Sequence, residues 1–139
     1  MIIHALFPFR HASCKYLSHK IGKQESELLD IESMGTLVCL IRSENFEQEV
    51  IAEKRPVLIL CMPRDEEFPN QLKVMEHIAT KHSQELKVAV LEEGLIEAFK
   101  KNYRVIGTPT FLLLVEGKER GRMLGLADQE MLTDLVLHS

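Results

Sequence analysis

The sequence has no strong excess of charge, no long apolar run and no pair of cysteines spaced as Cys-x-x-Cys. Its net charge of -4 at pH 7 provides no basic surface for nucleic acid or for an anionic membrane. No apolar run is long enough to span a bilayer. The three cysteines, Cys14, Cys39 and Cys61, are an odd number and lie far apart. They argue against a disulfide scaffold and favour a reducing compartment, so we expect a cytoplasmic protein without nucleic-acid or membrane partners.

The composition indicates one globular domain preceded by an extension. The 139 residues are 45% hydrophobic and 27% charged, which allows one complete apolar core. Residues 1–23 contain basic residues but no acidic residue, whereas acidic residues follow directly in "QESELLDIES". We expect residues 1–34 to be an extension that is mobile or carries one short helix, and residues 35–139 to form the domain.

The extension contains potential metal ligands, but they do not form a recognisable metal-binding motif. His11, Cys14 and His19 are potential ligands. However, their number is small and their spacing matches no common zinc pattern. We therefore expect no metal and no other cofactor.

From Thr36 onward, apolar runs alternate with segments of helical periodicity. The pattern predicts strands over residues 36–41, 57–61, 86–91, 110–115 and 119–124, and helices over residues 43–54, 69–82, 94–103 and from Asp128 onward. Strands joined by helices need parallel neighbours, while the turn at Glu116 and Gly117 makes the last two strands an antiparallel hairpin. The predicted fold class is therefore α/β, with a mixed central β-sheet in the order βαβαβαββα and helices on both faces.

Local details of these helices can also be predicted. Ser43 or Asn45 is a possible cap of the helix over residues 43–54. Phe68 is expected to be a core residue at the start of the next helix. The apolar residues of the last helix are expected to face inward: Met131, Leu132, Leu135 and Val136.

The segment "YRVIGTPTFLLLVEGKERGRMLG" resembles thioredoxins, and the likeness covers residues 35–138. Thioredoxins carry here a Tyr-x-Val/Ile-x-x-x-Pro-Thr segment, then a strand, a glycine turn and a closing strand that ends in glycine. The resemblance implies a thioredoxin-like fold in which Pro109 is the family's cis-proline. Gly107 and Gly125 fall at the family's glycine positions.

The same resemblance places the family's redox motif on residues without thiols. Aligning "VMEHIA" with the family's helix puts Asp65 at the attacking cysteine and Phe68 at the resolving one. The family's buried aspartate falls on Ile59. Thiol–disulfide exchange needs an attacking thiolate and a second thiol that releases the mixed disulfide. Both are absent, so the resemblance implies a protein that does not catalyse dithiol exchange.

Asp65, Glu66 and Glu67 place carboxylates at the positive end of the predicted helix, where ordinary capping would explain them. They would also form an acidic edge beside the cis-proline loop, suited to a partner with basic residues. The leading hypothesis is a redox-inactive thioredoxin-like protein that binds another polypeptide through the cis-proline groove. Its expected partner-binding residues are Asp65, Glu66, Glu67, Thr108 and Pro109. The stretch "VLILCMPRDEEFP" is similar to thioredoxin-like accessory proteins that assist assembly of other proteins, including hydrogenase maturation factors.

The alternative hypothesis is a single-cysteine redox enzyme. Cys61 lies at the carboxyl end of the predicted central strand, where ligands of parallel sheets gather. Its other interpretation is a small buried core residue, because no cationic partner is evident. A purely structural or oligomer-forming domain is a third interpretation.

Overall fold

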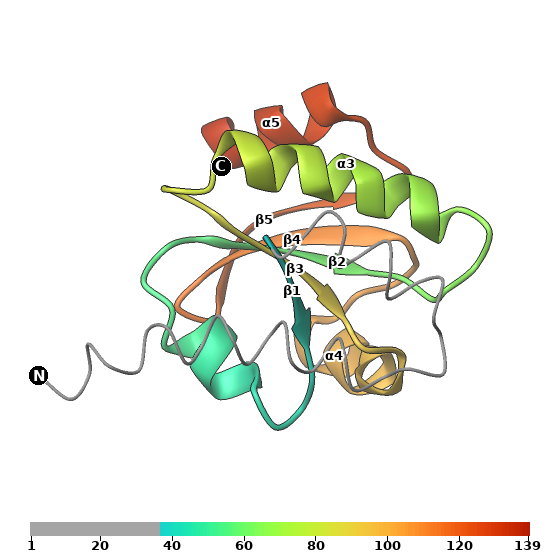
Figure 1. The fold of residues 1–139 in the computed structure, drawn as a ribbon. Helices are drawn as coiled ribbons and strands as arrows, with labels where there is room; N and C mark the ends of the chain where they lie inside the picture. Colours follow the sequence, from blue (N-terminus) through green and yellow to red (C-terminus); the bar gives the residue numbers. More distant parts are fainter. Residues whose placement is uncertain (1–36) are drawn as a thin grey trace, which may run out of the picture.

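The computed structural model describes residues 37–139, which form a five-stranded sheet covered by helices (Figure 1). The strands are β1 (Val38–Ile41), β2 (Val57–Cys61), β3 (Lys87–Leu91), β4 (Thr110–Val115) and β5 (Lys118–Leu124). The helices are η1 (Glu47–Ile51), α3 (Phe68–Lys81), η2 (Glu93–Leu95), α4 (Ile96–Tyr103) and α5 (Gln129–His138). The predicted N-terminal extension, its possible helix and the His11, Cys14 and His19 set lie outside the described residues.

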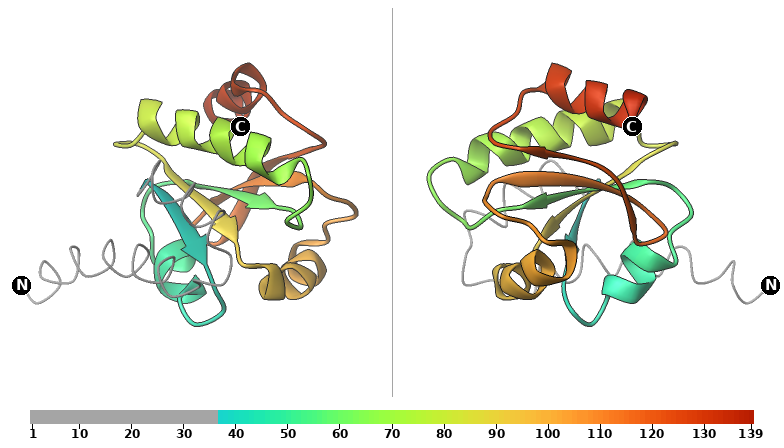
Figure 2. Two further views of the ribbon diagram at one scale, coloured as in Figure 1. Left: turned by 45° about the vertical axis from the view of Figure 1, so that its right-hand side comes forward. Right: turned by 180° about the vertical axis from the view of Figure 1, so that it is seen from behind.

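The sheet is mixed, with the strand order β1-β3-β2-β4-β5. β3 pairs in parallel with β1 and with β2, whereas β4 pairs antiparallel with β2 and with β5. α3 and α5 cover one face of the sheet, and α4 and η1 cover the other (Figures 1 and 2). The predicted fold class, an α/β protein with a mixed central sheet and helices on both faces, is confirmed.

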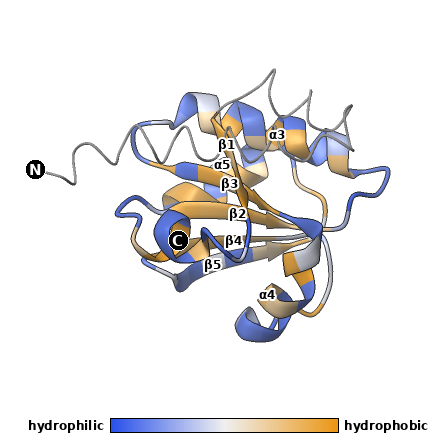
Figure 3. Ribbon diagram, turned by 60° about the horizontal axis from the view of Figure 1, so that its bottom comes forward, coloured by the Kyte–Doolittle hydropathy of each residue, from blue (hydrophilic) through white to orange (hydrophobic). Residues whose placement is uncertain are grey.

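Side-chain alternation divides the core into two apolar layers. In β2, Leu58 and Leu60 face the α3 and α5 layer, while Val57, Ile59 and Cys61 face the α4 and η1 layer. All five side chains are buried, as expected for a central strand with apolar residues on both faces. Figure 3 shows the resulting concentration of hydrophobic residues in the sheet, between the hydrophilic outer faces of the helices.

The first predicted helix is much shorter than expected. Only Glu47–Ile51 are helical, and they form a single π-helical turn. Neither Ser43 nor Asn45 caps it. The Asn45 side chain instead turns back to the end of β1, where it accepts from the Arg42 N–H (2.7 Å) and donates to the Leu40 carbonyl (3.2 Å). An asparagine that satisfies the preceding backbone in this way favours a turn over a helix start.

The last helix buries a narrower face than predicted. Asp128 caps it, accepting from the Met131 N–H at 2.9 Å. Leu132 is buried, and Leu135 and Val136 pack against the core, but the Met131 side chain is 44% exposed. The prediction that Met131 faces inward was wrong, because the buried face of α5 includes only Leu132, Leu135 and Val136.

A charged cluster joins η1 to the sheet at the amino end of β3. The Lys87 ammonium donates to the Glu49 carboxylate and to the Glu49 carbonyl (3.2 Å), and it lies 3.7 Å from Glu53. Arg55 pairs with Glu53 at 2.9 Å and donates to the Ser83 carbonyl at 3.0 Å. The Arg55 guanidinium keeps the Glu53 pKa at about 2 against the opposing effect of burial. Glu49 is buried, so the pairing with Lys87 offsets part of the cost of removing its carboxylate from water.

The loop before α5 is held to α3 by one side chain. The buried Gln71 amide donates to the Ala127 carbonyl at 3.1 Å and accepts from the Ala127 N–H at 2.9 Å. This pair of bonds satisfies both backbone groups of a buried residue.

Among residues 37–139, no helix has the length and apolar character needed to cross a membrane.

We predict that Gln71→Met destabilises the domain by about 2–4 kcal/mol, because two buried backbone groups of Ala127 lose their partners. Urea unfolding measures this change. Asn70→Met, at the neighbouring exposed position, is the matched control and should change stability by no more than about 0.5 kcal/mol. Equal effects of the two substitutions would show that the Gln71 bonds contribute nothing specific.

Candidate functional site

The carboxyl end of β2 brings two loops together. Cys61, the last residue of β2, pairs with Thr110, the first residue of β4. The loop over residues 106–109 therefore reaches the same edge of the sheet as the segment that leads from β2 into α3. The two segments contain the five predicted partner-binding residues, Asp65, Glu66, Glu67, Thr108 and Pro109.

The three acidic residues are exposed and precede the helix. α3 begins at Phe68, and Glu67, at its N-cap position, makes no side-chain capping bond. The Asp65 carboxylate accepts from the Glu67 N–H at 3.0 Å, which closes a local turn. Of the three acids, Asp65 is therefore used in a local turn before the helix, whereas Glu67 makes no capping bond.

The 106–109 loop is fixed at both sides but leaves backbone groups exposed. The Thr110 hydroxyl donates to the Gly107 carbonyl at 2.6 Å, and the Gly125 N–H donates to the Pro109 carbonyl at 2.8 Å. The peptide bond between Thr108 and Pro109 is cis. Thr108 is exposed, and its backbone N–H and C=O make no hydrogen bond within the described part of the chain. An extended peptide can pair with such groups.

Three exposed apolar side chains flank this loop. Ile106 is 87% exposed, and Leu124 and Leu126 are 55% and 49% exposed. A Cβ atom on Gly107 would lie 3.5 Å from Leu124 Cδ1, so Leu124 lies directly against the loop. We call Ile106, Thr108, Pro109, Leu124 and Leu126 the loop surface.

Sequence reasoning missed the apolar part of the loop surface. Val105 and Ile106 are adjacent apolar residues in a short loop, and only Val105 is buried. Leu124 ends the exposed edge strand next to Met123, which packs inward. At both positions, the signal in the sequence was a pair of adjacent apolar residues whose side chains point in opposite directions.

Of the positions that the resemblance assigns to the two motif cysteines, Asp65 is exposed and carries no thiol, and Phe68 is packed rather than reactive. Phe68 is buried, and the Arg64 guanidinium lies 4.3 Å from the centre of its ring. The Arg64 N–H donates to the Glu93 carboxylate at 2.8 Å. Ile59 is buried within the apolar layer beneath α4. This arrangement holds the segment in place without any thiol.

Cys61 is fully buried in the same layer. Burial raises the pKa of its thiol to about 11, and the positive charge of Lys100 offsets only part of this effect. A nucleophilic cysteine needs access and a lowered pKa, and Cys61 has neither. Within residues 37–139, no group of three or more potential metal ligands occurs.

Glu76 on α3 is a second group with a strongly changed pKa. One of its carboxylate oxygens is buried and has no hydrogen-bond partner in the described structure. Burial raises the Glu76 pKa from 4.5 to about 7. Glu76 lies eight residues beyond the start of α3, about 12 Å along the helix, so it is separate from the loop surface.

The comparisons with known proteins agree with this architecture. The chain is 27% identical to thioredoxin of Mycobacterium bovis over 103 residues, which cover 70% of this chain and 84% of that protein. Thioredoxins of two Mycobacterium tuberculosis strains match to the same extent. The relationship is thioredoxin-like. No family model matches the chain.

We predict that Cys61 in the folded protein resists alkylation by iodoacetamide near neutral pH, because its thiol is buried and remains protonated. Peptide mass mapping of the Cys61 peptide measures the labelled fraction. The same peptide should label fully after unfolding in guanidinium, which is the control. Rapid labelling of Cys61 in the folded chain would contradict this assignment.

We predict that Glu76→Gln stabilises the protein more at about pH 8 than at about pH 4.5. The folded-state pKa of Glu76 is raised, so ionisation costs stability as pH increases from 4.5 through about 7. Glutamine removes this cost, and its benefit should disappear at low pH. Thermal unfolding at both pH values measures the difference, with the exposed Glu130→Gln as control. Equal stabilisation at the two pH values would contradict the prediction.

Proposed function

We propose that this chain is a redox-inactive thioredoxin-like protein that binds an extended segment of another polypeptide at the loop surface. The observation that carries the proposal is the exposed residue Thr108, whose backbone makes no hydrogen bond within residues 37–139 and which lies between exposed apolar side chains. Backbone pairing supplies contacts that do not depend on sequence, while neighbouring side chains select among segments.

The apolar side chains supply the driving force. Ile106, Leu124 and Leu126 lose exposure when a partner covers them. Full burial of one such side chain is worth about 1.5–3 kcal/mol, although binding also costs entropy. Exposed apolar residues that gather around one loop are typical of an interaction site.

The acidic edge of Asp65, Glu66 and Glu67 gives the proposed site its charge. Its carboxylates are exposed, so they attract basic residues of a partner mainly during approach and orientation. Glu67, at the N-cap position of α3, makes no side-chain capping bond. The proposed partner therefore combines apolar residues with nearby lysine or arginine.

The proposal also states that this chain does not catalyse thiol–disulfide exchange. The motif positions carry Asp65 and Phe68, and Cys61 is buried with a raised pKa. The single-cysteine enzyme is therefore not the function that the site supports. Assistance in the assembly of other proteins, as in thioredoxin-like accessory proteins, is one role that this binding could serve. The cytoplasmic location stays a prediction from the cysteine count.

We predict that Ile106→Asp abolishes capture of the partner by the immobilised protein, because a carboxylate replaces the most exposed apolar side chain of the loop surface. Quantitative mass spectrometry of proteins captured from the native extract measures this loss. Leu137→Asp, at a 63% exposed position on α5, is the matched control and should retain capture.

Neutralising Asp65, Glu66 and Glu67 together should weaken the same association more at low salt than at high salt, since exposed charges are screened over about 8–10 Å at ordinary ionic strength. Retained capture by Ile106→Asp, with all variants folded, would exclude the loop surface as the binding site. Unchanged affinity and salt dependence of the triple variant would exclude a role for the acidic edge.

A further inference from the structure

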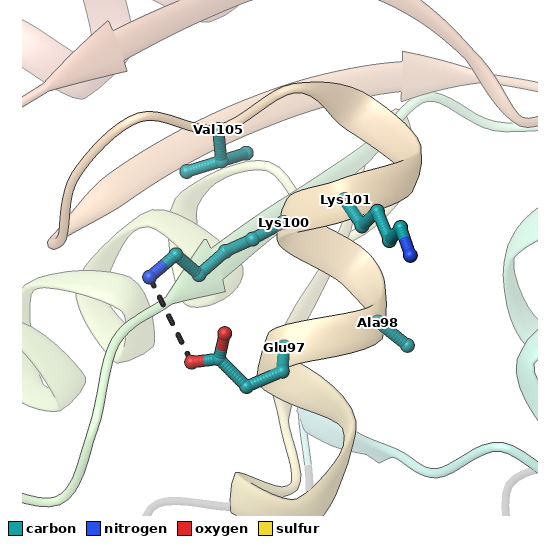
Figure 4. A pocket seen from close by; sticks show the side chains of 5 residues that line it. All are labelled: Glu97, Ala98, Lys100, Lys101 and Val105. Atoms are coloured by element: carbon teal, nitrogen blue, oxygen red, sulfur yellow. Dashed lines mark ion pairs between the residues drawn. The ribbon is translucent and has the colours of Figure 1, made fainter.

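A second feature lies beside the loop surface, on the flank of α4. A hollow of about 480 Å³ is lined by Glu97, Ala98, Lys100, Lys101 and Val105. Val105, at one wall of the hollow, directly precedes Ile106 of the loop surface in the chain. Figure 4 shows the Lys100 and Glu97 side chains reaching toward each other below Val105.

The hollow combines an apolar wall with a cation. Val105 and Ala98 provide apolar surface, and the Lys100 side chain is only 30% exposed. Lys100 lines this hollow together with Val105, the residue that directly precedes the loop surface. The cation therefore lies beside the loop surface.

The existing partner of Lys100 is easily exchanged. Its ammonium lies 3.7 Å from the Glu97 carboxylate, whose side chain is 87% exposed. Ion pairs this exposed contribute little, because water and salt screen them. Lys101 and Arg104 add two exposed positive charges to the same end of α4, so the basic residues there outnumber Glu97.

The geometry points to the hollow as a subsite for an aspartate or glutamate side chain of the bound polypeptide, with Lys100 as its cation. The inference rests on the proposed function. The partner's carboxylate takes the place of Glu97 beside Lys100, and its methylene groups pack on Val105. The partner thus carries an acidic residue on the α4 side and basic residues toward Asp65, Glu66 and Glu67.

A set of labelled peptides tests the subsite. Each peptide has an apolar centre and one variable residue, Glu, Gln or Lys, placed in turn on either side of that centre. Fluorescence anisotropy at low salt measures their affinities. For one placement we expect wild type to bind the Glu peptide about threefold to fivefold more tightly than the Gln peptide, as for an exposed ion pair.

Variants of the protein identify the residue responsible. Lys100→Gln should remove the preference for Glu, and Lys100→Glu should reverse it in favour of the Lys peptide. Lys81→Gln, which neutralises an exposed lysine of α3, is the matched control and should keep the preference. Amide resonances of Lys101 and Val105 should shift with the Glu peptide more than with the Gln peptide. Equal thermal stability of the variants ensures that the comparison reports binding.

The outcomes separate the two proposals. If wild type binds the Glu and Gln peptides equally in every placement, the proposed subsite is wrong. If Ile106→Asp then abolishes binding of both peptides, the loop surface is still supported as the binding site. If the preference for Glu survives Lys100→Gln, Lys100 is not the cation and the inference is overturned. If no peptide binds wild type, the proposed function fails and the subsite fails with it.

Discussion

The pairing of β2 with β4 is the constraint on which the rest of the site depends. β2 is buried on both faces and has hydrogen-bonded neighbours on both sides, so none of its side chains can contact a ligand. Only the segments at its ends reach solvent. Because Cys61 is paired with Thr110, the end of β2 and the beginning of β4 are fixed at one edge, together with the start of α3. The acidic segment and the loop with exposed Ile106 and Thr108 meet where that strand stops, which is where ligands of open α/β sheets bind.

Much of the fold could be predicted because buried strands have a simple pattern. Continuous apolar runs predicted β2 and β4 within a residue, and the periodicity of α3 predicted its bounds equally well. The prediction of a helix over residues 43–54 was wrong because the Asn45 side chain bonds to the backbone of the preceding strand end, a local competition that periodicity does not reveal. The prediction for Met131 was wrong because the width of the buried face of α5 depends on how the helix packs against its neighbours.

The candidate site was predictable only in part. The acids and the loop with Pro109 could be found because the resemblance gave them a place in a known fold. Ile106 and Leu124 could not, since an apolar residue at a loop or strand end is exposed or buried according to what packs beside it. The pKa of Glu76 depends in the same way on burial rather than on residue type.

The pairing of Lys87 with Glu49 constrains how this sequence can change. The two residues are 38 positions apart, and each neutralises the other's charge in a buried setting. Loss of Lys87 leaves the buried Glu49 carboxylate without its cation, which typically costs about 3–5 kcal/mol, whereas replacing both residues by apolar residues of similar volume is often tolerated. The lysine therefore cannot be lost alone without threatening the fold. Relatives that have lost the lysine should also have lost the glutamate, so the two sites evolve as one unit.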